Sequence, residues 1–158
     1  MKTGRVRYRL AGAAILLVVA LATAPGASAD QVFHSERIAL TPVAGAPLRS
    51  GFVADLRPNG PIVYELERYV LIGAAPNTAY DVQFEVFINN PSCAGAPDFG
   101  FLDTTLQTDR FGNAEALVTL PPSAIPPDAH GLTFGGVWQV LTGGTVAYQT
   151  ACVPTTLD

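Results

Sequence analysis

The residue types that most often carry out catalysis are few in this chain of 158 residues, which contains two cysteines and two histidines. The G-x-S-x-G sequence that places a nucleophilic serine on a strand-to-helix turn does not occur. Cys93 and Cys152 do not lie in a recognisable cysteine-hydrolase motif. The sequence therefore predicts no nucleophilic catalysis, and an enzyme is the less favoured interpretation.

Histidine and acidic side chains are the candidate metal ligands in this chain. His34 and Glu36 are two residues apart, so on a strand they share one face and could supply two zinc ligands. His130 is distant in the sequence, so a third ligand would depend on the fold. Calcium prefers carboxylate oxygens, but no twelve-residue calcium loop occurs. The three acids considered for calcium are Asp98, Asp103 and Asp109. We expect no metal and no other cofactor.

Two pairs of acidic residues are spaced to share a strand face, namely Glu65 with Glu67 and Asp81 with Glu85. Glycosidases use two carboxyl groups about 5 to 9 Å apart. Acids at positions i and i+2 of any strand meet that distance, so the spacing has little diagnostic value. We expect both pairs to lie on solvated outer faces of the fold.

Several aromatic residues fall out of phase with the expected core or lie in expected loops. Exposed aromatic side chains mark binding surfaces, although a small cluster packed under long loops would explain them equally well. These residues are Tyr69, Phe87, Phe99, Phe101 and Phe111. The candidate ligand-binding residues are Phe87, Phe99 and Phe101, together with the single tryptophan, Trp138.

The first 29 residues are typical of a secretory signal peptide. Basic residues precede a continuous apolar run at residues 10–24, and Ala27-Ser28-Ala29 has small residues where signal peptidase cuts. The alternative is an uncleaved anchor, but 15 apolar residues are fewer than the ~20 that span a bilayer. We therefore expect a leader at residues 1–29, one secreted domain at residues 30–158, and no membrane association after cleavage.

The expected domain is acidic. Without the leader, five arginines face thirteen acids and no lysine remains, which gives a net charge of −8. Binding to phosphate backbones depends on Lys and Arg, so nucleic acid is excluded as a partner. Because exported chains meet oxidising conditions, the even cysteine count predicts one disulfide, between Cys93 and Cys152.

The clearest structural signal is the run of residues 76–88, in which apolar and polar residues alternate as in a half-buried β-strand. Other strand-like runs separated by Gly, Pro and Asn occupy residues 31–40, 48–56, 62–72, 101–108, 114–120, 132–141 and 146–153. Eight such runs predict an all-β fold, and we favour an antiparallel, immunoglobulin-like sandwich of about 7–9 strands over a small barrel.

Two hairpins and one bulge follow from local sequence. We expect residues 101–108 to pair with 114–120 through the turn at 109–113, and residues 132–141 to pair with 146–153 through Gly143-Gly144. Alternation in residues 62–72 fails at Arg68, which predicts a β-bulge near Glu67-Arg68. The expected core is Tyr64, Leu66, Val82, Phe84, Val86, Leu102, Leu106, Val118, Leu132, Phe134, Trp138 and Val140.

Pro76-Asn77-Thr78-Ala79-Tyr80-Asp81-Val82 resembles the P-x-T-x-Y-x-V run of immunoglobulin-like and fibronectin-like sandwiches. The resemblance implies a tyrosine corner, in which the Tyr80 hydroxyl bonds to backbone where the chain crosses between sheets. The strands before and after Pro76 would then lie in opposite sheets. A plain hairpin at this point is the alternative.

From about residue 62 onwards the chain also resembles the neocarzinostatin-type apoproteins, which are secreted, acidic sandwiches. The likeness rests on N-T-A-Y-D-V, P-D-F, T-D-R-F-G-N-A, the tryptophan strand and a cysteine-bearing hairpin. That family holds an enediyne chromophore in a cleft, so the resemblance implies a carrier of a small apolar ligand. The family has two local disulfides, whereas this chain has cysteines for one distant bridge.

Together these observations predict a secreted, non-enzymatic protein with a binding or surface-structural role, whose partner is a protein or a small apolar ligand. An apolar cleft beside Trp138, Phe99 and Phe101 would favour the small-ligand carrier. A flat strand edge or an exposed aromatic patch would favour protein association. A hydrolase with an unrecognised site is the remaining alternative.

Overall fold

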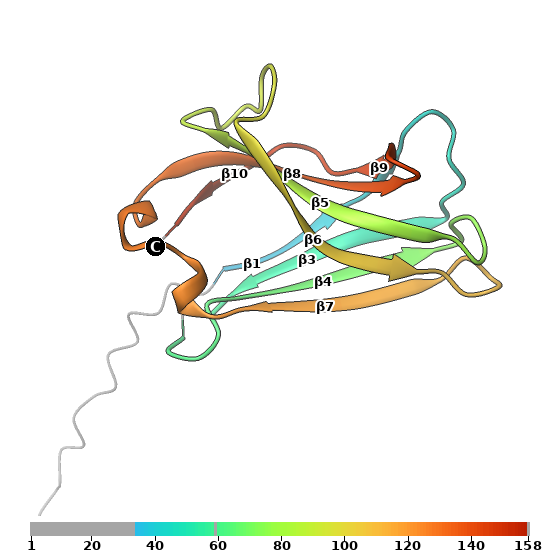
Figure 1. Cartoon of the computed structure of the whole chain (residues 1–158), viewed down its shortest axis with the longest axis horizontal. Helices are drawn as coiled ribbons and strands as arrows, with labels where there is room; N and C mark the ends of the chain where they lie inside the picture. Colours follow the sequence, from blue (N-terminus) through green and yellow to red (C-terminus); the bar gives the residue numbers. More distant parts are fainter. Residues whose placement is uncertain (1–33, 59, 158) are drawn as a thin grey trace, which may run out of the picture.

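The computed structural model describes residues 34–58 and 60–157, which form two antiparallel sheets packed face to face (Figure 1). The predicted all-β sandwich with one disulfide is confirmed. The expected leader at residues 1–29 lies outside the described residues. Within the described residues, no helix is long and apolar enough to span a bilayer.

The first sheet has four strands in the order β1-β3-β4-β7. Their bounds are His34–Ala39 for β1, Ser50–Arg57 for β3, Glu65–Ile72 for β4 and Ala114–Leu120 for β7. The second sheet has the order β2-β9-β8-β5-β6, with β10 also paired to β8. Its strands are β2 (Thr41–Pro42), β9 (Thr145–Gln149), β8 (Thr133–Thr142), β5 (Ala79–Ile88), β6 (Phe99–Gln107) and β10 (Val153–Thr156).

The chain passes from one sheet to the other between β4 and β5, as the motif around Tyr80 predicts, so the hairpin alternative is wrong. The Tyr80 hydroxyl does not bond to backbone, however. It lies 3.1 Å from the hydroxyl of Tyr148, which in turn donates to the carbonyl oxygen of Pro47 at 2.8 Å. Because a hydroxyl has one proton, Tyr80 is the donor in the tyrosine pair.

The predicted hairpin between residues 101–108 and 114–120 is wrong. β6 pairs with β5 and β7 pairs with β4, so the chain crosses back to the first sheet at the turn after Thr108. The two crossings pack together: Ala74 N–H donates to the carbonyl of Gly112 at 2.9 Å, and the Thr108 hydroxyl donates to Ala75 at 2.7 Å. Gly112 has φ of 78°, and a side chain there would collide with Ala74. The second predicted hairpin, β8 with β9, is confirmed.

The core is formed by side chains from both sheets. Half of the expected residues are in it or pack against it, namely Val82, Phe84, Leu106, Val118, Trp138 and Val140, and Tyr64 and Val86 are buried outside this cluster. The expected core position of Leu66 is wrong, because Leu66 alternates with Glu65 and Glu67, which point inward. Leu102 and Leu132 are also outside the core, with 59 % and 42 % of their surfaces exposed. Leu102 is displaced by a register irregularity in β6, and Leu132 lies before β8, where it faces a cavity. The buried cluster is Ile38, Leu40, Val53, Tyr69, Leu71, Ala74, Tyr80, Val82, Leu106, Trp138, Val140, Ala147, Tyr148 and Val153.

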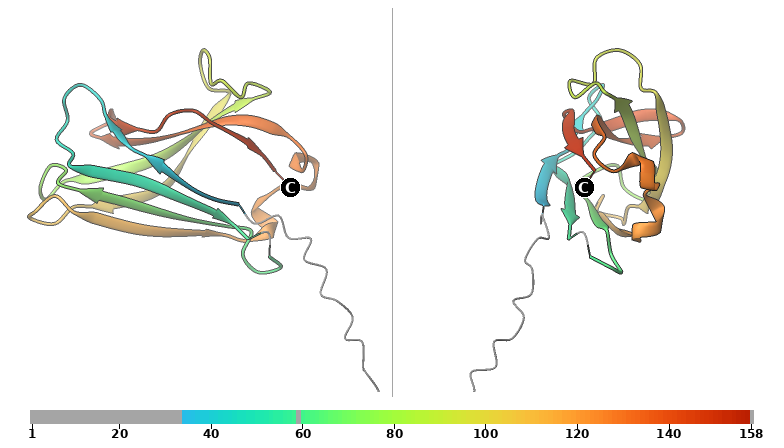
Figure 2. Two further views of the ribbon diagram at one scale, coloured as in Figure 1. Left: turned by 180° about the vertical axis from the view of Figure 1, so that it is seen from behind. Right: turned by 90° about the vertical axis from the view of Figure 1, so that its left-hand side faces the viewer.

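The disulfide joins Cys93, in the loop after β5, to Cys152, between β9 and β10. The bridged residues are 59 positions apart in the sequence, so the link closes a long loop. The segment between β7 and β8 contains two 3₁₀ turns, Pro122–Ala124 and Pro127–Ala129. Figure 2 shows this orange segment crossing one open end of the sandwich.

Candidate ligand-binding cleft

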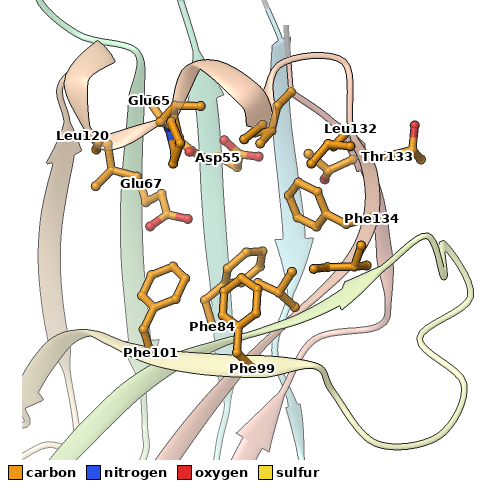
Figure 3. A pocket seen from close by; sticks show the side chains of 18 of the residues that line it. Asp55, Glu65, Glu67, Phe84, Phe99, Phe101, Leu120, Leu132, Thr133 and Phe134 are labelled. Atoms are coloured by element: carbon orange, nitrogen blue, oxygen red, sulfur yellow. The ribbon is translucent and has the colours of Figure 1, made fainter.

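A cavity of about 500 Å³ opens between the two sheets at the end crossed by the segment between β7 and β8. Figure 3 shows Phe84, Phe99 and Phe101 together on one side and the carboxyl groups of Asp55, Glu65 and Glu67 on another. Apart from its acids and two threonines, all the side chains that line it are apolar. The volume is within the range of small-molecule sites, which are mostly apolar with few polar groups.

The acidic part of the lining comes from β3 and β4. In β4 the inward positions are Glu65, Glu67, Tyr69 and Leu71, and Arg68 points outward to Glu115 of β7. The pairing of β4 with β3 and β7 continues through Arg68 without a register shift. The predicted bulge at Glu67-Arg68 and the predicted outward position of Glu65 and Glu67 are therefore wrong. Burying Tyr69 and Leu71 fixes the phase of the strand, and the glutamates follow with period two.

The aromatic part of the lining comes from β6, whose alternation changes halfway along the strand. Val82 pairs with Thr104 and Gln83 pairs with Leu102, so Asp103 is an extra residue in β6. Such a bulge reverses the alternation, so that the side chains before Asp103 are out of phase with those after it. Phe101 and Phe99 thereby join Phe84 and Val86 of β5 on the cleft side.

Phe84 is the centre of the aromatic cluster. Its ring centroid lies 4.5 Å from that of Trp138, 5.8 Å from Phe101 and 6.1 Å from Phe134. These separations and the edge-on or tilted orientations are those that aromatic pairs prefer. Gly136 of β8 makes the arrangement possible, because a Cβ atom there would lie 2.5 Å from the Phe84 ring.

The segment between β7 and β8 forms the outer wall. Two of its four prolines, Pro122 and Pro127, each begin a 3₁₀ turn, and all four restrict the backbone. Ala124, Ile125 and Leu132 contribute apolar side chains to the lining, and Asp128 contributes an acid. The wall is therefore a short, stiff stretch of chain placed over an apolar cavity.

Glu67 is almost fully buried, with 4 % of its surface exposed, and its carboxyl group has two hydrogen-bond partners. The Trp138 indole N–H donates to Oε1 at 3.0 Å, and the Tyr69 hydroxyl lies 2.6 Å from Oε2. The same Tyr69 hydroxyl also contacts the Asp103 carboxylate. One hydroxyl proton cannot serve both acids, so one carboxyl must be protonated and donate to the Tyr69 oxygen.

The protonated carboxyl is that of Glu67. Burial, together with the hydrogen bond and negative charge of Asp103, raises the pKa of Glu67 to about 10. Burial and the neighbouring charge of Asp55 raise the pKa of Glu65 to about 8. Burial and the adjacent carboxylates also raise the pKa of the Tyr69 hydroxyl, which stays neutral. In the folded protein at neutral pH, the two glutamates are therefore mainly uncharged.

Asp55 lies directly across from Glu67 in the pairing of β3 with β4. It is 2 % exposed, and its Oδ2 is 3.4 Å from Nε of Arg57. Its Oδ1 has no hydrogen-bond partner among residues 34–58 and 60–157. An unpaired, buried carboxylate oxygen is costly, and it lies in the lining of the cleft.

Three of the four candidate ligand-binding residues are brought together: Phe99, Phe101 and Trp138 all line the cleft. Phe87 does not, because it points to the other face of β5, where it is buried opposite Gly135 and beside the loop that carries Cys93. Phe111 is exposed in the turn after β6 and lies outside the lining. Tyr69 is buried beneath the cleft rather than exposed.

The acids considered for calcium have separate structural roles. Asp98 accepts from the backbone N–H of Ile88, Asp103 contacts Tyr69, and Asp109 accepts from the backbone N–H groups of the turn that follows it. Over residues 34–58 and 60–157, no three His, Cys, Asp or Glu side chains are grouped so as to hold a metal ion.

Sequence reasoning missed Asp55, and it considered Glu65 and Glu67 but placed them on a solvated face instead of in the cleft. No local signal places Asp55 inward, because the apolar Phe52, Ala54 and Leu56 alternate with it and favour the other face. In β4, the alternation followed back from Leu71 and Tyr69 would have placed Glu67 in phase with them.

No protein-family model, curated protein or solved structure matches this chain. The resemblance to the neocarzinostatin-type apoproteins therefore stays a prediction.

Proposed function

We propose that this protein is an exported, non-enzymatic carrier that binds a small, mainly apolar molecule in the cleft between its sheets. The observation that carries the proposal is a cavity of about 500 Å³ whose wall is a cluster of four phenylalanines and a tryptophan. Phe99 and Phe101 remain 50 % and 44 % exposed on the wall of this hollow. Concave apolar surface of this kind is typical of ligand sites.

The lining explains how an apolar guest would be held. Trp138 is buried in the core but also lines the cleft, so the aromatic cluster is anchored on one side and accessible on the other. A flat apolar guest would cover the rings of Phe99 and Phe101. Removing each fully exposed phenyl ring from water stabilises a complex by about 2 kcal/mol, and a half-exposed ring contributes about half of that.

The test is a fluorescence titration with pyrenemethanol, a neutral apolar probe. Trp138 is the single tryptophan of the chain, so quenching of its emission reports a guest in the cleft. We expect saturable quenching, and binding roughly five-fold weaker in Phe99→Ala because about 1 kcal/mol of contact is lost. Phe111→Ala is the matched control, since Phe111 is 64 % exposed outside the cleft. Equal loss in both variants, or no saturable quenching, would refute the proposal.

Acid-catalysed hydrolysis is the second candidate, because carboxyl groups with raised pKa values in a cleft are typical of general acids. Glu65 and Glu67 meet that description. The hydroxyl and imidazole groups of Ser and His do not line the cavity in the described residues, so a carboxyl group would have to act. Turnover of nitrophenyl glycosides that is lost in Glu65→Gln would favour this candidate over the carrier.

A further inference from the structure

We propose that the molecule bound in the cleft is an amphipathic cation: its apolar body packs on the phenylalanines while a protonated amine binds the carboxyl groups of Asp55 and Glu65. This inference rests on the proposed function, since it names the chemical class that the cleft selects.

The first observation is the state of Asp55. Its carboxyl group lines the cleft, is almost wholly buried, and leaves Oδ1 without a hydrogen bond among the described residues. Buried polar atoms in native proteins are nearly always hydrogen-bonded, and each exception needs an explanation. A hydrogen-bond donor on a bound molecule would supply the partner that Asp55 Oδ1 lacks.

The second observation is the balance of charge around this point. Arg57 is the cation beside Asp55: its Nε lies 3.4 Å from Oδ2 without forming a hydrogen bond, and one guanidinium N–H donates to the carbonyl of Thr156 at 3.3 Å. Acids face the same region from several neighbouring elements, whereas β5, β8 and β10 contribute none to the lining. These acids are Asp55 on β3, Glu65 and Glu67 on β4, Asp103 on β6, Asp128 on the outer wall and the exposed Glu36, which pairs with Asp55 from β1. His34 of β1 pairs with Arg57, and His130 stacks edge-on against Tyr64.

An ammonium group fits this surrounding better than a neutral or anionic group. It has three donors and no acceptor, which matches a set of carboxylate oxygens. Hydrogen bonds between ionised partners in a cavity with apolar walls are about twice as strong as neutral ones. An anionic ligand would instead add to the negative charge already present, and an alcohol would offer one donor.

The protonation state of Glu65 couples binding to pH. Burial, together with the charge of Asp55 and a hydrogen bond to it, raises the pKa of Glu65 to about 8, so the empty cleft holds a proton between these two carboxyl groups at neutral pH. A bound ammonium group favours the ionised carboxylate, and that proton leaves. The cation therefore takes the place of the proton, and binding of an amine strengthens as pH rises towards the pKa of Glu65.

The experiment compares three probes that share one apolar body: pyrenemethylamine, pyrenemethanol and pyrenecarboxylic acid. Quenching of Trp138 emission gives each dissociation constant at about pH 6 and about pH 8.5, below and above the raised pKa of Glu65. We expect the amine to bind at least ten-fold more tightly than the alcohol at the higher pH, and the acid to bind most weakly. The preference for the amine should shrink at the lower pH.

Glu65→Gln removes the charge and keeps the shape, and Asp81→Asn is its control because Asp81 is exposed on the outer face of β5. We expect Glu65→Gln to reduce the preference for the amine at least five-fold and the control to leave it unchanged. Equal binding of all three probes to the wild-type protein would overturn the amine inference and leave the apolar carrier standing. Absence of binding by all three would overturn the proposed function as well.

Discussion

Replacing Glu67 with glutamine should change how the stability of the protein depends on pH. Glu67 has an unfolded-state pKa near 4.3, whereas in the folded protein burial and Asp103 raise it to about 10. Between these values the folded state holds a proton that the unfolded state has lost. The unfolding free energy is therefore largest in acid and falls as pH rises towards the folded-state pKa.

The size of this pH dependence follows from the single proton that Glu67 keeps in the folded state. The free energy of unfolding falls by about 1.4 kcal/mol per pH unit for each such proton, or about 3 kcal/mol between about pH 5 and pH 7. Glu65 adds to the same slope over the range up to its pKa of about 8. Glutamine mimics the protonated acid: its carbonyl oxygen accepts from Trp138 and its amide donates to the Tyr69 oxygen, which leaves the Tyr69 proton for Asp103.

The assay is urea denaturation of wild type and Glu67→Gln at a series of pH values from about pH 5 to pH 8. We expect the stability advantage of the glutamine variant to grow by about 1.4 kcal/mol per pH unit. Asp81→Asn, at an exposed position, is the control and should follow the wild-type slope. An advantage that stays constant with pH would refute the inference that Glu67 is protonated in the folded protein.

Three further predictions concern the frame around the cleft. Replacing both Cys93 and Cys152 with alanine should lower the unfolding free energy by about 4 kcal/mol, measured by denaturation, because the bridge closes a loop over 59 positions; a loss under about 1 kcal/mol would contradict the chain-entropy argument. Tyr148→Phe should lower the free energy of unfolding by about 1–3 kcal/mol, because the Tyr80 hydroxyl and the Pro47 carbonyl both lose their hydrogen bond to Tyr148. Tyr80→Phe should lower it less, because the Tyr148 hydroxyl still donates to Pro47. Gly136→Ala should destabilise by about 1–3 kcal/mol and weaken pyrenemethanol binding, because its Cβ displaces the Phe84 ring; unchanged binding would show that Phe84 does not shape the site.

The sequence predicts the sandwich because its strands alternate with period two and are separated by turn residues. It also predicts the crossing before β5, since the run around Tyr80 marks such corners. The crossing after β6 has no such mark: Asp109 and Gly112 form a tight turn that looks locally like a hairpin, and only the pairing of β7 with β4 shows otherwise.

The cleft could be predicted only in part, because the side chains that β4 and β6 turn towards it are determined by packing in the folded protein. In β4 the local pattern places Glu65 and Glu67 in solvent, and the need to bury Tyr69 and Leu71 reverses it. The cost of burying Glu67 is offset by proton uptake and by hydrogen bonds to Trp138 and Tyr69. In β6 the local sequence does not indicate the bulge at Asp103, which turns Phe101 and Phe99 inward.

The central claim, that the cleft holds a small apolar molecule, is tested most directly by locating one. An NMR spectrum of the protein saturated with pyrenemethanol would show which protons lie next to the probe. We predict nuclear Overhauser contacts from the pyrene ring to Phe84, Phe101 and Leu132, which line the cleft on β5, on β6 and before β8. Contacts confined to exposed apolar residues elsewhere, such as Phe111 and Leu117, would contradict the account.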